Sequence, residues 1–136
     1  MTKSKKLFIR PESLKCFIKS VLIKLEIPKD HTDIIADSLI FASTRGIDSH
    51  GIIRLPYYIK RLKQKGTKSN PKIKIISDYR GTALIDGDNG MGQVIGIFAS
   101  DLAIKKAIEF GIAMVNVKNS SHFGAASFYS NYIAKH

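Results

Sequence analysis

Apolar side chains recur at helical spacing near the start of the chain. The spacing i, i+3, i+4, i+7, i+8 and i+11 is met by Leu14, Phe17, Ile18, Val21, Leu22 and Leu25. Such a stripe lies on one face of an amphipathic helix, which we expect from about Glu12 to Glu26, between Pro11 and Pro28. The cysteine at position 16 falls at helical spacing beside this stripe and is expected in the core.

Two further helices are predicted before residue 70. An acidic start at Asp30 opens the second, whose apolar positions continue to a glycine at Gly46. Pro56 suits the first turn of the third, which ends near Gly66. The segment 1–70 is therefore expected to form an N-terminal helical unit.

The pattern changes after Asn70-Pro71. Alternating apolar positions at Ile73 and Ile75 predict a strand, and residues 82–86 predict a second strand, so we expect the two to form a hairpin. A long helix follows over about 91–110 and ends at Gly111.

The remaining segments indicate another strand and another helix. Residues 112–117 are short, apolar and β-branched, as in an interior strand, and a helix begins near Ala125. The fold class is thus α+β (mixed α/β), with segment 71–136 forming an α/β unit of sheet and helices.

Composition and charge limit the classes of protein and of binding partner that the chain fits. With 44% hydrophobic and 24% charged residues, the 136-residue chain has the composition of a soluble globular domain, and no apolar run is long enough to cross a membrane. We expect a cytoplasmic location. The net charge of +11 is a legitimate hint of nucleic acid, but the lysines are scattered over several segments, which favours a solvated surface.

Two loops place a histidine beside a glycine. They read Gly46-Ile47-Asp48-Ser49-His50-Gly51 and Asn119-Ser120-Ser121-His122-Phe123-Gly124. Glycine lets a ligand approach closely, and imidazole titrates near working pH. Arg54 follows the first loop and could hold a carboxylate through its planar fork, while Tyr58 lies one helical turn further on.

These residues leave structural alternatives open. A loop histidine near an arginine is more often surface structure than catalysis, and His122 could equally be a capping or packing histidine. His31 and His136 are isolated, so no metal site is expected.

A glycine-rich segment, Asp86-Gly87-Asp88-Asn89-Gly90-Met91-Gly92, precedes the long helix. A dinucleotide-binding fingerprint would require an acidic residue at the end of the next strand, where Lys118 stands instead. We therefore expect the glycines to form a turn rather than a phosphate cradle.

Together, the two histidine loops, the Arg54-Leu55-Pro56-Tyr57-Tyr58 segment and the glycine-rich segment resemble the malate/L-lactate dehydrogenase family, from Glu12 to the C-terminus. The resemblance implies hydride transfer between NAD or NADP and a small 2-oxo/2-hydroxy carboxylate, on a fold that is not a Rossmann fold. It implies catalytic roles for His50 and His122 and substrate binding by Ser49, Arg54 and Tyr58, and leaves open which histidine exchanges the proton.

The resemblance also implies a homodimer and a truncated chain, since family members hold the cofactor mainly with segments beyond residue 136. The cofactor-binding residues are therefore unknown. Two alternatives remain at this point: an inactive remnant of a dehydrogenase, and a basic module that binds nucleic acid. The second would explain the charge but not the histidine loops.

Overall fold

The computed structural model describes residues 8–136. Along the chain it contains α1 (Pro11–Ile23), α2 (Lys29–Thr44), the 3-10 turns η1 (Asp48–His50) and η2 (Ile52–Arg54), α3 (Leu55–Lys63), β1 (Lys74–Tyr79), β2 (Thr82–Gly90), α4 (Gly92–Phe110), β3 (Met114–Ser120) and α5 (Ala126–Ile133). The predicted α+β class is confirmed, with helices first and a small mixed sheet after them.

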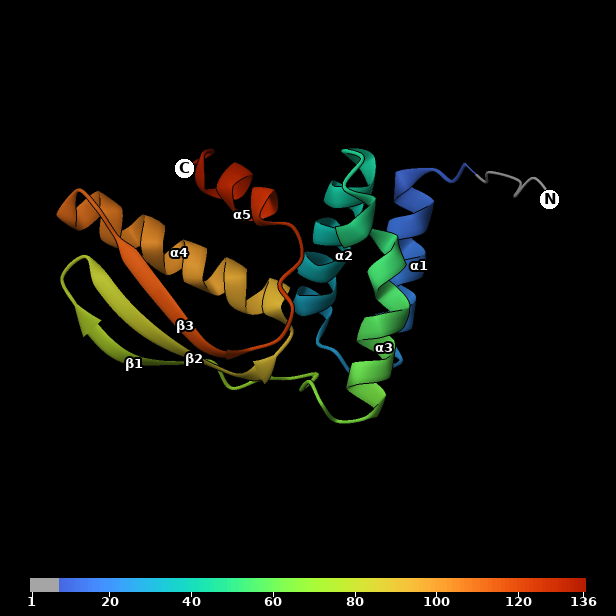
Figure 1. Ribbon diagram of the computed structural model, residues 1–136, viewed down its shortest axis with the longest axis horizontal. Helices are drawn as coiled ribbons and strands as arrows, with labels where there is room; N and C mark the ends of the chain where they lie inside the picture. The colour runs from blue at the N-terminus through green and yellow to red at the C-terminus, as the bar shows by residue number, and fades with distance from the viewer. Residues whose placement is uncertain (1–7) are drawn as a thin grey trace.

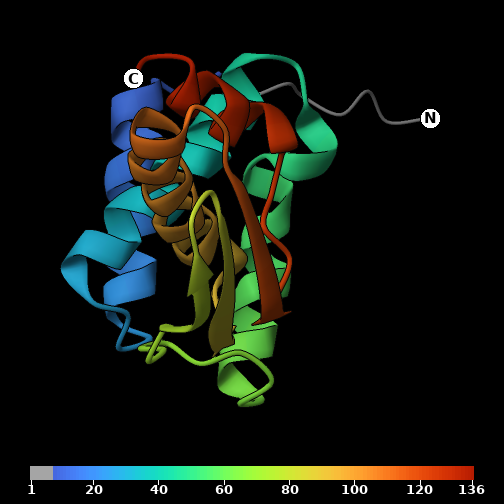
Figure 2. The ribbon, with the colours of Figure 1, turned by 90° about the vertical axis from the view of Figure 1, so that its left-hand side faces the viewer.

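The two kinds of element occupy opposite ends of the molecule. Helices α1, α2 and α3 gather at one end, and the sheet with α4 along it extends to the other (Figure 1). Seen from the sheet's end, α4 covers one face of the strands (Figure 2). The histidine loops leave α2 and β3 where these two parts meet.

The hydrophobic core joins the helical end to the start of α4. Its fully buried members include Ile18, Leu22, Ile35 and Leu39, and they pack in one cluster with Met91. The stripe predicted for the first helix thus supplies core residues, but only along part of its width.

Two expectations for α1 are wrong. Cys16 is exposed, and Phe17 keeps 56% of its surface in contact with solvent. The face of α1 that is covered is the one that carries Ile18 and Leu22, and residues 16 and 17 lie outside it.

Three strands form the sheet, in the order β1-β2-β3. β1 and β2 are antiparallel and joined at Arg80-Gly81, which confirms the predicted hairpin. β3 runs parallel to β2 after the crossover through α4. The expectation of an interior strand for 112–117 is wrong within the described chain, because β3 pairs with β2 alone and leaves Met114 and Val117 exposed.

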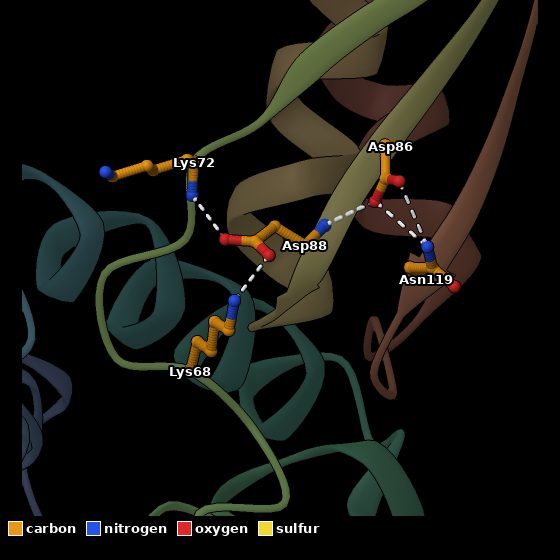
Figure 3. A network of polar contacts seen from close by, with 5 residues as sticks. All are labelled: Lys68, Lys72, Asp86, Asp88 and Asn119. Atoms are coloured by element: carbon orange, nitrogen blue, oxygen red, sulfur yellow. Dashed lines mark hydrogen bonds and ion pairs between the residues drawn. The ribbon is translucent and has the colours of Figure 1, made fainter.

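The glycine-rich segment does not reverse the chain as a turn would. It continues β2 as far as Gly90, with a register shift after Asp86 and left-handed φ angles of 50° and 55° at Asp88 and Asn89. Carboxylates hold this bulge: Asp86 accepts from the N–H of Asp88 at 2.9 Å, and Asp88 accepts from the N–H of Lys72 at 2.9 Å (Figure 3). The N–H of Asp88 in the bulge is therefore satisfied by a side chain, and the side chain of Asp88 ties the bulge to the segment before β1.

Candidate active site

The loop that carries Ser49, His50 and Arg54 is fixed against the end of α2. Gly46 adopts a φ of 71°, and the following residue, Ile47, donates its N–H to the carbonyl of Ala42 at 2.9 Å, which closes the helix. A Cβ on Gly51 would lie 2.2 Å from Oγ of Ser43, so glycine allows the loop to approach the helix this closely. The predicted glycine stop of this helix is thereby confirmed.

The second histidine loop is held by the start of α4. A Cβ on Gly92 would lie 2.4 Å and 2.6 Å from the carbonyl oxygens of Ser121 and His122, which shows direct backbone contact. The Oγ of Ser121 accepts from the N–H of Gly92 at 3.2 Å and donates to the carbonyl of Gly90 at 2.8 Å. The position of His122 is therefore set by the bulged end of β2 and the first turn of α4.

These supports bring the two histidines together. The rings of His50 and His122 stack with centroids 5.4 Å apart and an interplanar angle of 24°. The two rings come from loops 72 positions apart in the sequence. Neither is fully buried, so a small ligand has access to the pair.

Tyr58 connects His122 to the interior. Its hydroxyl lies 2.9 Å from Nδ1 of His122 and accepts a hydrogen bond from Nε2 of Gln93 at 2.7 Å. The tyrosine is buried, with 2% of its surface exposed, and this burial raises the pKa of Tyr58 to about 12. The hydroxyl therefore keeps its proton across the physiological range.

Arg54 and Ser49 complete the cluster around His50. Nε of Arg54 donates to the carbonyl of Ser49 at 2.5 Å, and Oγ of Ser49 lies 2.8 Å from Nδ1 of His50. Within residues 8–136, the two terminal nitrogens of Arg54 make no hydrogen bond. They remain able to form the paired contact that guanidinium makes with a carboxylate.

The electrostatics favour a neutral His122. Desolvation is the main cause that lowers the pKa of this imidazole below its usual 6.5, and the charges of Arg54 and His50 lower it further. Because two stacked imidazoles repel when both are protonated, the pair does not readily hold two positive charges.

All five residues singled out in the sequence thus lie in one cluster: Ser49, His50, Arg54, Tyr58 and His122. Sequence reasoning missed Gln93, whose amide is fully buried against Tyr58. A signal existed, because Gln93 is an isolated amide among the buried residues Met91, Val94 and Ile95 at the start of a helix. A polar side chain in such surroundings needs a partner.

At two glycines of the glycine-rich segment, protein atoms occupy the space that a side chain would take. A Cβ on Gly87 would lie 2.6 Å from the side chain of Ile95, and one on Gly90 would lie 2.4 Å from Pro71. Packing against the protein itself therefore accounts for these two glycines, and that the segment forms no phosphate cradle stays a prediction.

Two observations concern other kinds of site. Between residues 8 and 136 no three His, Cys, Asp or Glu side chains gather closely enough to hold a metal ion. In the same part of the chain no helix combines the length and apolar character needed to cross a bilayer.

Comparison with known proteins decides the family. The sequence profile described as "Malate/L-lactate dehydrogenase" matches residues 9–136. The chain belongs to the malate/L-lactate dehydrogenase family. The family predicted from the histidine loops and the glycine-rich segment is therefore confirmed.

Relatives within this dehydrogenase family include a malate dehydrogenase from Pyrococcus horikoshii, 44% identical over 119 residues, which are 88% of this chain and 33% of the relative. An L-sulfolactate dehydrogenase from Methanocaldococcus jannaschii is 44% identical over 91% of this chain and 36% of the relative. The ureidoglycolate dehydrogenase (NAD(+)) of Escherichia coli is 32% identical over 93% of this chain and 36% of the relative.

The fold agrees with that of a solved family member. The structure of the Pyrococcus horikoshii malate dehydrogenase superposes with a TM-score of 0.93 and 41% identity, over 95% of this chain and 37% of that one. The chain spans about a third of the length of the curated relatives it matches. The family and an oxidoreductase ancestry follow from these matches.

Proposed function

We propose that the chain provides the substrate half of a nicotinamide-dependent dehydrogenase that interconverts small 2-hydroxy and 2-oxo carboxylates. The observation that carries this proposal is the stacked pair of His50 and His122, with Tyr58 in contact with Nδ1 of His122 and Arg54 held by the carbonyl of Ser49, next to His50 in the chain. A carboxylate-binding cation next to titratable rings is the set of groups that a 2-hydroxy acid requires.

Each residue has a distinct task. The free nitrogens of Arg54 bind the substrate carboxylate, which fixes the neighbouring hydroxyl or carbonyl oxygen near the histidine pair. One imidazole removes the hydroxyl proton during oxidation and returns it during reduction, while the other donates a hydrogen bond to the same oxygen. Ser49 orients His50 through the 2.8 Å contact to Nδ1, and Tyr58 orients His122.

The described residues fit only the reacting end of the cofactor. Rings and a guanidinium can flank a nicotinamide and a carboxylate, but Gly87 and Gly90 are closed by packing and offer no phosphate site. When bound, the nicotinamide would take hydride from the substrate carbon or deliver it. Residues that hold the rest of the cofactor would come from sequence that relatives carry outside the matched third.

Several finer features belong to the same proposal. The substrate would be of the malate or sulfolactate type named for the relatives, and the cofactor NAD or NADP. Division at about residue 70 into a helical unit (1–70) and a cofactor-domain segment (71–136) remains a prediction, as does the cytoplasmic location. A homodimer is supported by apolar residues on the exposed strand β3 at the sheet edge.

Activity tests the proposal. We expect the chain alone to oxidise NADH or NADPH feebly or not at all with oxaloacetate, pyruvate or sulfopyruvate, because hydride donor and acceptor must be positioned together. Joined to the C-terminal two thirds of the Pyrococcus horikoshii relative, it should turn over, and replacement of His50 or His122 by alanine should remove most of that activity.

A folded chimaera that binds cofactor but reduces none of these 2-oxo acids would contradict the proposed function. Robust turnover by residues 1–136 alone would contradict a narrower point, namely that the cofactor is held by other sequence. Exchange of Lys60, an exposed residue of α3, for glutamine provides a control that should leave turnover unchanged.

A further inference from the structure

The amide of Gln93 is the polar group that the proposed mechanism leaves without a task. It is fully buried, its Nε2 donates to the hydroxyl of Tyr58, and its Oε1 has no hydrogen-bond partner within the described chain. A buried amide with only half of its capacity used is costly, so its presence beside the histidine cluster calls for a reason.

The donor on Gln93 determines the direction of the next hydrogen bond. A tyrosine hydroxyl has one proton to donate, and here its oxygen already accepts from Gln93. Within residues 8–136 the hydroxyl has one other contact, 2.9 Å to Nδ1 of His122, so its buried proton finds an acceptor only if it is donated there. A neutral imidazole that accepts at Nδ1 carries its proton on Nε2.

The opposite orientation of the amide is less favourable. With Oε1 turned towards Tyr58, the NH2 group would take the buried position in which Oε1 finds no partner within residues 8–136, and unpaired buried N–H donors are rarer than unpaired carbonyl oxygens. Another buried polar atom, Oγ of Ser38, likewise has no hydrogen-bond partner within residues 8–136. This Oγ lies near Gln93, because a Cβ built on Gly124 would be 2.9 Å from Oγ of Ser38 and 3.6 Å from Nε2 of Gln93.

We infer that Gln93 is a positioning residue which, through Tyr58, holds His122 in the neutral form with its proton on Nε2. Nε2 makes no hydrogen bond within residues 8–136, so this N–H is available to a ligand. His122 then offers a hydrogen-bond donor rather than a lone pair. Where it concerns the substrate, this inference rests on the proposed function, and it assigns the proton exchange to His50.

Protonation of His122 is opposed by the same arrangement. A proton on Nδ1 would require the hydroxyl of Tyr58 to accept from His122 and to donate elsewhere, which means turning the buried amide of Gln93. Arg54 and the ring of His50 act in the same sense, and the lowered pKa of His122 agrees with it. The groups that face this imidazole are thus all arranged to keep it neutral.

The direct test is the tautomer of His122 in the wild-type chain. Two-bond 1H–15N correlation spectra of 15N-histidine-labelled protein at about pH 8, where an imidazole is neutral, distinguish the two tautomers. Assignment uses His50→Ala and His122→Ala. The inference requires the proton on Nε2, and a proton on Nδ1 or an equal mixture would overturn it.

Variants test whether Gln93 is the cause. Gln93→Glu offers a carboxylate in place of the N–H. At about pH 9, the upper end of the pKa values known for buried glutamates, the carboxylate should accept a hydrogen bond from the hydroxyl of Tyr58. The oxygen of Tyr58 would then accept from His122, which moves the proton of His122 to Nδ1. Tyr58→Phe, which removes the link, should leave both tautomers populated. Gln64→Leu, at an exposed glutamine after α3, should leave the spectrum of His122 unchanged.

If His122 keeps its proton on Nε2 in both Gln93→Glu and Tyr58→Phe, Gln93 does not set the tautomer and the inference fails. None of these spectra requires substrate or cofactor. An inactive chimaera with the expected tautomer would therefore refute the proposed function alone, and an active chimaera with the other tautomer would refute this inference alone.

Discussion

Removal of the Tyr58 hydroxyl should destabilise the chain because it strands a buried amide. In Tyr58→Phe, Nε2 of Gln93 loses its partner at 2.7 Å, while Oε1 already has no partner within residues 8–136. An unsatisfied buried donor costs about 1–3 kcal/mol, and Gln93 has no exposed surface through which water could compensate. His122 also loses its contact at Nδ1, but its ring is partly exposed, so this loss should cost less than that of the fully buried amide.

A second substitution separates this effect from loss of packing. Gln93→Leu removes the amide and keeps most of its volume, so it should change the free energy of unfolding by less than about 1 kcal/mol. In the double variant no amide is stranded, and Tyr58→Phe should then cost about 1–2 kcal/mol less than it does alone.

Urea unfolding followed by far-ultraviolet circular dichroism measures these differences, since the chain has no tryptophan to report by fluorescence. Tyr57→Phe, at the half-exposed neighbouring tyrosine, is the matched control and should stay within about 0.5 kcal/mol. Additive effects of Tyr58→Phe and Gln93→Leu, within about 0.5 kcal/mol, would refute the reasoning.

Three other outcomes are expected. The pKa of His122 is lowered from 6.5, so its contribution to stability is complete above pH 6.5 and is lost as the pH falls towards the folded-state pKa. In His122→Gln, the free energy of unfolding measured in urea should therefore fall less steeply over that pH range. An identical pH dependence in the variant and the wild type would contradict this expectation. Gly92→Ala should cost about 1–3 kcal/mol by the same assay, since a Cβ meets the carbonyl of Ser121 at 2.4 Å, and a neutral effect would contradict that contact. Arg54→Lys in the active chimaera should raise KM for the 2-oxo acid by about tenfold with a smaller change in kcat, and an unchanged KM would exclude carboxylate binding by Arg54.

Helices and the hairpin could be predicted because their signals are local. Periodicity and bounding glycines fixed the ends of α2 and α4 to within a few residues, and Gly46 and Gly111 adopt the left-handed angles that such ends require. The burial of single side chains depends on which neighbours cover them. Phe17 matched the apolar stripe but is 56% exposed, because within residues 8–136 the covered face of α1 is the one that carries Ile18 and Leu22.

The place of β3 in the sheet could not be predicted, for a similar reason. Its apolar run resembles an interior strand, yet in the described chain only β2 pairs with it. An exposed apolar edge is consistent with a chain that spans about a third of its relatives' length, where further sequence could cover it.

Within the candidate site, sequence reasoning found the residues but not their connections. Loops rich in glycine identified His50 and His122, whereas their stacking depends on contacts between α2, α3, α4 and β3 that are distant in sequence. Gln93 was missed because a glutamine has no motif, and its importance emerges only from its burial against Tyr58.

The central claim is that His50, His122 and Arg54 form a site for a small 2-hydroxy carboxylate. A titration of the 15N-histidine-labelled chain with (S)-malate, at constant pH and ionic strength, tests it most directly. We expect saturable shifts of the His50 and His122 resonances, unchanged His31 resonances, and loss of the response in Arg54→Gln but not in Lys60→Gln. Absence of saturable shifts, or an unchanged response in Arg54→Gln, would contradict the account.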